Sequence, residues 1–404
     1  IDFIRCPALA LVAALVVLSS PMVRASDGAT DAAGQYPAVA GYYEFFVYLP
    51  AGQAPEVAYA EESCSGTLIA SQVLLTAAHC TAFNYTEDIG VAGYSSEVWV
   101  SFDVTATAND FRCFLAGSGA QYTEYLVGEY ACNAAEQTTP APTFRRAATT
   151  GRKDGVSIAH GITHPDYLRR ELRKDGRAER AERNLQNAPD VGALILEAPV
   201  MDVEPMTLRA VGELSATDLI GTQAIGVGYG LNWGKTTGKR PTSGLGPMTD
   251  LGGGSGVRRI AQLGPIEVVK TNSLWPRQSV QKGDDSVCFG DSGSPLFLQR
   301  DGIVEPIVTA VLSGATNWCQ GSKDPYYRID QPAAQDFIQC VVAHQDDVAA
   351  ACRECGAEAY FGLCEELPAP WSRFVAARFS QSLERRKHRE LALDPLAEHS
   401  SGRL

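Results

Sequence analysis

The chain consists of short runs of β-forming residues separated by glycine, proline and polar turns. Such runs lie at residues 73–77, 98–102, 193–196, 224–227, 295–298 and 307–312. Short runs with frequent turns predict an all-β fold. Strands that close into barrels leave no exposed edges, and their loops are then free to carry chemistry. A chain of 404 residues, of which 45% are hydrophobic, is long enough to bury such a core.

The balance of charged residues argues against one class of partner. The formal net charge is -13 at pH 7, whereas affinity for nucleic acid depends on clustered lysine and arginine. A glycine-rich run at residues 252–256 lacks the Lys-Ser or Lys-Thr ending of a phosphate-binding loop. We therefore expect that neither nucleic acid nor a nucleotide binds.

The first residues have the pattern of an export signal. Arg5 provides a positive start, residues 8–18 form an unbroken apolar run, and residues 23–25 include small residues before a cleavage point. The apolar run is shorter than the roughly 20 residues that span a bilayer, so we expect residues 1–25 to be removed. Loss of Cys6 leaves ten of the eleven cysteines, an even number that suits disulfides in an oxidising compartment. The protein is expected to be secreted, or periplasmic if it is bacterial.

Two stretches interrupt the β pattern. Residues 102–157, rich in alanine, threonine and glycine at first, contain Cys113 and Cys132, which predicts a long surface insertion with its own disulfide. Residues 168–187 are dense in arginine, lysine, glutamate and aspartate of nearly balanced sign. That balance favours a solvated helix or loop over an anion-binding patch.

Three motifs offer the groups that peptide hydrolysis needs, which are a nucleophile, a base and a residue that orients the base. Ser292 lies in Cys-Phe-Gly-Asp-Ser-Gly-Ser-Pro, where the glycines permit a sharp loop with inward-pointing N–H groups. His79 ends an apolar run in Leu-Thr-Ala-Ala-His-Cys. Asp190 heads the apolar run Val-Gly-Ala-Leu-Ile-Leu, where burial fixes its carboxylate. His160 and His164 are rival bases without the Ala-Ala-His-Cys context.

These segments resemble the trypsin and chymotrypsin family of serine proteases, in which Thr-Ala-Ala-His-Cys, an Asp heading an apolar strand and Gly-Asp-Ser-Gly follow one another in this order. Asp166 is a rival acid, but no apolar strand follows it. Further stretches between Tyr36 and about His344 are similar, namely Tyr36-Pro37, Cys64-Ser65-Gly66-Thr67-Leu68-Ile69, His164-Pro165-Asp166-Tyr167, Gly228-Tyr229-Gly230, Val311-Leu312-Ser313-Gly314 and residues 336–342.

The resemblance implies a fold and a domain order. Residues 26–344 would form an all-β domain of two packed antiparallel six-stranded β-barrels with a C-terminal helix, carrying the two insertions. A cysteine-containing C-terminal extension follows at residues 345–404.

The resemblance also implies a function, that of a secreted serine endopeptidase acting on protein or peptide substrates through an acyl-enzyme intermediate. The triad would be His79, Asp190 and Ser292, and the N–H groups of Gly290 and Ser292 would form the oxyanion hole. No metal or cofactor is expected. Ser313 would bond to Asp190, and its carbonyl with Gly314 and Ala315 would line the substrate strand. A catalytically silent homologue that binds partners is the competing function, which the complete triad disfavours.

Substrate preference is left open between two alternatives. In the family, the residue six before the nucleophile forms the floor of the specificity pocket, which here is Ser286. An uncharged floor favours apolar or aromatic side chains, unless Val287 is an extra residue that lets Asp285 reach the pocket and select Arg or Lys. Tyr326 is expected to narrow the pocket.

Activation departs from the family pattern. The family's Ile-Val-Gly-Gly start corresponds here to residues 25–28, where only Gly28 matches. Removal of the signal itself could therefore create the amine that pairs with Asp291, or another contact could hold that loop.

The remaining cysteines complete the expected framework. By resemblance, Cys64 pairs with Cys80 and Cys288 with Cys319. In the extension, Cys352, Cys355 and Cys364 could join Cys340 in two disulfides with three possible pairings, with a zinc site as the alternative. Farther on, apolar residues recur at helical spacing among arginines and lysine, predicting a helix that docks on the acidic body or associates with an anionic surface. They are Trp371, Phe374, Val375, Phe379 and Leu383.

Overall fold

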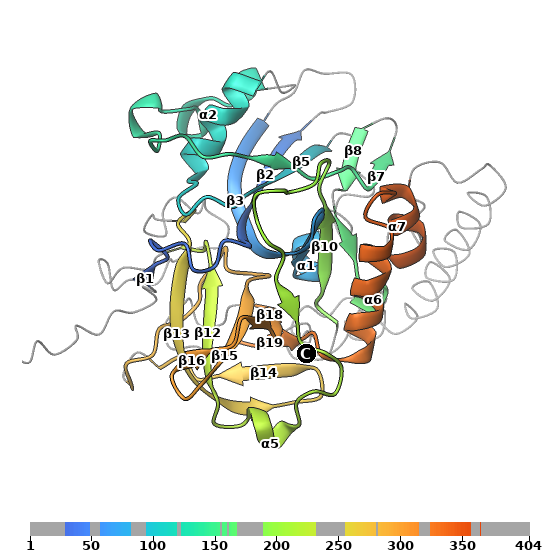
Figure 1. The fold of residues 1–404 in the computed structure, drawn as a ribbon. Coiled ribbons are helices and arrows are strands. Elements are labelled where there is room, and N and C mark those ends of the chain that lie inside the picture. The colour runs from blue at the N-terminus through green and yellow to red at the C-terminus, as the bar shows by residue number, and fades with distance from the viewer. Residues whose placement is uncertain are drawn as a thin grey trace, which may run out of the picture.

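The computed structural model describes residues 29–48, 57–81, 94–118, 123–153, 156–159, 161–167, 189–231, 255–279, 282–314, 324–356 and 364. Two curved β-sheets lie one above the other in Figure 1, and a pair of helices flanks them. The signal sequence, the charged stretch at residues 168–187 and the apolar helix expected beyond residue 370 lie outside the described residues.

One sheet closes into a barrel of six strands. Its order is β13-β12-β15-β18-β19-β14, and β14 pairs back onto β13. The strands are β12 (Gln223–Gly228), β13 (Arg259–Val269), β14 (Ser273–Pro276), β15 (Pro295–Arg300), β18 (Ala310–Leu312) and β19 (Tyr326–Arg328). β1 (Ala29–Thr30) and β16 (Ile303–Val304) add to β13 and β15.

The other sheet has seven strands in the order β6-β5-β2-β3-β4-β10-β9. They are β2 (Val39–Tyr48), β3 (Val57–Ala70), β4 (Val73–Thr76), β5 (Tyr94–Ser101), β6 (Arg145–Arg146), β9 (Ile162–Thr163) and β10 (Gly192–Ile195). No ladder joins its two ends within the described residues. An isolated bridge between Ala147 and Leu196 nevertheless brings the end of β6 against the end of β10, so this sheet curves into a half-barrel.

The expectation of a mostly β fold is confirmed, and one of the two predicted six-stranded barrels is closed. The second differs because β6, only two residues long, meets β10 through a single bridge and not through a ladder. β6 also lies inside residues 102–157, so part of the expected insertion is sheet.

β4 and β10 are buried on both faces, which explains their continuous apolar sequence. Val73 and Leu75 point into one core cluster while Leu74 points into another. All residues of both strands are buried. Core packing on both faces therefore fixes the position of β4 and β10, and with them the strand ends next to which His79 and Asp190 lie.

The insertion packs onto the sheet through a hydrophobic cluster of its own. α2 (Ala108–Ser118) buries Phe111 and Leu115 against Tyr43 and Phe45 of β2. The same region contains the short helices η1 (Thr123–Tyr125), η2 (Gly128–Tyr130) and η3 (Ala134–Glu136) and the hairpin of β7 (Gly151–Lys153) and β8 (Val156–Ala159). A disulfide joins Cys113 to Cys132.

Two helices near the end of the described residues pack beside β4 and β9. These are α6 (Pro332–Ala343), which contains the expected closing helix, and α7 (Val348–Cys355). Disulfides join Cys340 to Cys355 and Cys352 to Cys364. Within the described residues, no helix has the length and apolar character needed to cross a membrane. The remaining elements are α1 (Ala78–Thr81), α5 (Ala216–Leu219), β11 (Thr207–Leu208) and β17 (Ile307–Val308).

Candidate active site

His79 and Asp190 are brought together by the pairing of β4 with β10. The strands are antiparallel, and Gly192 lies opposite Thr76. The start of β10 therefore lies beside the end of β4. His79 follows β4 in the single turn of α1, and Asp190 directly precedes β10.

Asp190 is fully buried and accepts three hydrogen bonds. The main-chain N–H of His79 donates to Oδ1 at 2.9 Å. The ring Nδ1 of His79 lies 2.9 Å from Oδ2, and the hydroxyl of Ser313 donates to the same oxygen at 2.6 Å. Its side chain is 0% exposed, whereas that of His79 is 32% exposed. The carboxylate thus holds one edge of an imidazole whose other edge is accessible.

Asp190 also changes the protonation of His79. Burial opposes the charged imidazolium, but the negative charge of Asp190 and its hydrogen bond outweigh burial, so the pKa of His79 lies above its ordinary value. This arrangement stabilises a histidine that has accepted a proton.

Ser292 lies on the loop of residues 288–294, here called the nucleophile loop. Two glycines in the left-handed region bend it, Gly290 at φ 90° and Gly293 at φ 82°. A Cβ on Gly293 would lie 2.1 Å from the hydroxyl of Thr76, so no other residue fits there. The main chain of β3 holds the loop, since the N–H of Ser65 donates to the carbonyl of Ser292 at 2.7 Å.

The nucleophile loop leaves two main-chain donors available. In the part of the chain that the structure describes, the N–H groups of Gly290 and Ser292 donate to no other group. Neighbouring N–H groups are used, because Gly293 donates to the carbonyl of Leu312 and Ser294 to that of Asp291, both at 2.9 Å. These two donors belong to Ser292 itself and to the residue two positions before it, and paired main-chain donors at a nucleophile can bind a developing oxyanion.

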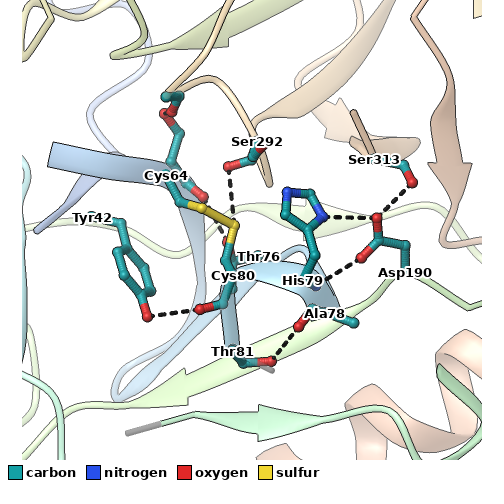
Figure 2. Close-up of a disulfide and its surroundings, with 12 residues drawn as sticks. Tyr42, Cys64, Thr76, Ala78, His79, Cys80, Thr81, Asp190, Ser292 and Ser313 are labelled. Atoms are coloured by element: carbon teal, nitrogen blue, oxygen red, sulfur yellow. Dashed lines mark hydrogen bonds and ion pairs between the residues drawn. A yellow bond between two sulfur atoms is a disulfide. The ribbon is translucent and has the colours of Figure 1, made fainter. Parts of the chain in front are cut away.

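Figure 2 shows the ring of His79 between Ser292 on one side and Asp190 on the other. The neighbouring disulfide between Cys64 and Cys80 links β3 to α1. Its Cys80 sulfur lies 3.8 Å from the carbonyl oxygen of Ser292. The cysteine bridge therefore fixes the histidine turn next to the nucleophile loop.

Asp291 anchors the nucleophile loop from inside. Its carboxylate accepts from the N–H of Gly230 and from the N–H of Cys288, each at 2.8 Å. Burial raises the pKa of Asp291 to about 6, although these two hydrogen bonds and the charge of Arg259 act in the opposite direction. The carboxyl faces a cavity that Ser286 and Arg259 also line.

The residues expected to set substrate preference are placed as follows. Ser286 is buried. Asp285 is held elsewhere, because its carboxylate accepts from the N–H of Gln262 on β13 at 2.8 Å. Tyr326 is fully buried in the closed barrel. Gly314 is half-buried two residues after β18, and Ala315 lies outside the described residues.

Of the rival residues, the structure describes the base His164 and the acid Asp166. His160 lies outside the described residues. His164 is buried, with its Nε2 3.1 Å from the carbonyl of Ala333 and its Nδ1 accepting from the N–H of Asp166 at 3.1 Å. The side chain of Asp166 is exposed.

The cysteines are committed to disulfides throughout the described ranges. Cys288 is disulfide-bonded, while its expected partner Cys319 lies outside them. The pairing in the extension is one of the three that the sequence allowed. Cys340 and Cys355 lie near His344, but their sulfurs are bonded to each other, and a disulfide sulfur is not the thiolate that zinc requires. The alternative of a zinc site is therefore not supported there.

Sequence reasoning did not single out two residues of β3 beside the nucleophile loop. The hydroxyl of Ser65 donates to the carbonyl of Gly290 at 2.9 Å. Glu62 is 2% exposed, and both of its carboxyl oxygens are buried without a hydrogen-bond partner among the described residues. A glutamate in an otherwise β-forming run was the signal available, but its burial depends on an irregularity in the strand.

No family model matches the sequence, and no curated protein matches it. Among solved structures, one described as "Atomic resolution structure of HBP" aligns over 78% of this chain and 96% of that chain, at 16% identity and a TM-score of 0.40. A likeness at this level carries no argument about function.

Proposed function

We propose that the protein is a serine endopeptidase of the trypsin and chymotrypsin type, with His79, Asp190 and Ser292 as its catalytic triad. The observation that carries this proposal is the buried Asp190, which accepts from both the main chain and the ring of His79 and from Ser313. A fully buried carboxylate that orients a partly exposed histidine keeps that histidine in the tautomer and position it needs to act as a general base.

In the proposed mechanism, Nε2 of His79 takes the proton from the hydroxyl of Ser292 as Oγ attacks the carbonyl carbon of the substrate. The oxyanion is bound by the N–H groups of Gly290 and Ser292. The imidazolium then gives its proton to the leaving amine as the peptide C–N bond breaks. Water attacks the resulting ester by the same steps, which releases the acid and restores Ser292.

The negative charge of Asp190 stabilises the imidazolium throughout, consistent with the raised pKa of His79. Asp190 does not itself need to take a proton. Ser313 supports this role because its hydroxyl donates a further hydrogen bond to Oδ2 of Asp190.

Two further parts of the proposal concern where the enzyme acts and on what. Disulfides such as those that join Cys64 to Cys80 and Cys113 to Cys132 are typical of proteins from oxidising compartments, and we propose that the protein is exported. We propose cleavage after apolar or aromatic residues, since Ser286 is uncharged and Asp285 is tied to β13.

Covalent labelling by a fluorophosphonate probe tests the proposed function. The folded protein should be labelled at Ser292, as mapped by mass spectrometry, and Ser292→Ala should not be labelled. Ser294→Ala is the matched control, because that serine is two residues away and fully buried. A folded wild-type protein that stays unlabelled would favour the silent homologue.

A further inference from the structure

Glu62 reaches the nucleophile loop because of an irregularity in β3. Tyr42 lies opposite Cys64 and Tyr43 lies opposite Glu62, so Ser63 is an extra residue that forms a β-bulge. Adjacent residues of β2 point to opposite faces of the sheet. The bulge therefore places Cys64 on one face with Tyr42 and Glu62 on the other face with Tyr43.

On that face, the carboxyl group of Glu62 lies directly behind Gly290. A Cβ built on Gly290 would lie 2.7 Å from Oε2 and 3.0 Å from Oε1 of Glu62. The glutamate therefore occupies the space that a side chain at position 290 would take. Its oxygens are buried and accept no hydrogen bond from any described residue. An ionised carboxylate in that state would lack the solvation that it has in water.

The charges around Glu62 also disfavour its ionisation. Asp291 faces it from the nucleophile loop and Glu61 from its own strand, and Arg259 of β13 is the cation that both Glu62 and Asp291 face. The phenol of Tyr43 on β2 also lies close to Glu62 but is uncharged, because burial and a charge on Glu62 raise its pKa. Burial, followed by repulsion from Asp291, holds the pKa of Glu62 well above its ordinary value, and Arg259 only partly offsets this. The guanidinium of Arg259 is therefore shared between two buried carboxyls, those of Glu62 and Asp291.

We propose that Glu62 is a positioning residue for the nucleophile loop, whose uncharged carboxyl supports Gly290 from behind and whose ionisation displaces the loop and slows the reaction of Ser292. The inference rests on the proposed function. A negative charge on Glu62 would repel Asp291, which anchors the loop, and would also oppose the oxyanion that forms beside Gly290.

The rate at which the fluorophosphonate labels Ser292, measured over the whole pH range in which the protein stays folded, tests the inference. In the wild type the rate should fall by about tenfold per pH unit once Glu62 ionises. Glu62→Gln keeps the shape of the neutral carboxyl, so it should label at the wild-type rate below the pH at which Glu62 ionises and show no fall above it. Glu61→Gln, the matched control on the half-buried neighbour, should keep the fall and only move it to lower pH, because one of the charges that repel an ionised Glu62 is removed. Equal pH profiles in the wild type and Glu62→Gln, or a wild-type profile with no fall, would overturn the proposal.

A second measurement does not depend on the reactivity of Ser292. Because the pKa of Glu62 is higher in the folded than in the unfolded state, its contribution to stability is complete below the unfolded pKa and is lost as pH rises through the folded pKa. Above the range in which Asp291 titrates, the unfolding equilibrium constant of the wild type should rise by about tenfold per pH unit relative to Glu62→Gln, until Glu62 ionises in the folded protein. Glu62→Leu repeats the test should the amide fold poorly.

The two measurements separate the two proposals. A protein that is never labelled but shows this proton uptake on folding has lost the proposed function, while its Glu62 is protonated as inferred. A protein that is labelled equally well in the wild type and Glu62→Gln at every pH keeps its proposed function and refutes the role of Glu62.

Discussion

Replacement of Asp190 by asparagine should invert the hydrogen bonding of His79 while leaving the fold in place. The asparagine amide offers one acceptor and one donor group where Asp190 offers two acceptors. Its oxygen must occupy the Oδ1 position, because the main-chain N–H of His79 points there at 2.9 Å. The amide NH₂ then occupies the Oδ2 position and faces Nδ1, which lies 2.9 Å from Oδ2 in the wild type.

In this variant Nδ1 must accept a hydrogen bond, so Nε2 carries the proton and cannot take one from Ser292. The expected loss in kcat is about 10⁴-fold, which corresponds to about 5.5 kcal/mol of transition-state stabilisation. The pKa of His79 should fall as well. The charge and hydrogen bond of Asp190 raise it in the wild type, and the opposing effect of burial remains after the substitution.

Turnover of a peptide substrate, together with an NMR titration of His79, measures both effects. Asp166→Asn is the matched control, since that carboxylate is exposed and its replacement should leave both quantities unchanged. Near-normal turnover in folded Asp190→Asn, or an unchanged pKa of His79, would show that Asp190 does not orient the base.

Further outcomes are expected from three other experiments. Ser292→Ala and His79→Ala should each remove nearly all turnover without unfolding the protein, because the two side chains act as a unit; substantial activity in either one, measured with a peptide substrate, contradicts the triad. Replacing both Cys113 and Cys132 by serine should lower the free energy of unfolding by about 2 to 4 kcal/mol, while Ser292 is still labelled. An unchanged denaturant midpoint would show that this disulfide does not stabilise the insertion. A peptide library should be cleaved mainly after Leu, Phe, Tyr or Met; dominant cleavage after Arg, abolished by Asp285→Ser, would show that this carboxylate leaves its bond to β13.

The sequence alone determined the features that depend on neighbouring residues in the chain, namely two buried strands and the sharp loop at Ser292. Continuous apolar runs predicted β4 and β10, because a strand that is buried on both faces has no solvent-facing side to mark with polar residues. Glycines on both sides of Ser292 predicted a sharp loop, and both Gly290 and Gly293 take positive φ. Those motifs were sufficient to propose which residues act together.

The sequence left undecided what depends on long-range pairing. The sequence allowed three pairings of the four cysteines near the C-terminus. The observed pairing joins Cys340 to Cys355 across the turn between α6 and α7, and that contact depends on how the two helices pack. Helix α2 was not expected, because its apolar residues are stabilised by Tyr43 and Phe45 of a distant strand rather than by a strong local pattern.

Only the tertiary structure decided the environment of Glu62. By simple alternation along β3, Glu62 and Cys64 would share one face of the sheet. The extra residue Ser63 separates them and turns the glutamate toward Gly290. A bulge depends on how two strands pair and leaves no reliable mark on the sequence of either strand. The position of the Glu62 carboxyl behind the nucleophile loop therefore follows only from the assembled structure of β2, β3 and residues 288–294.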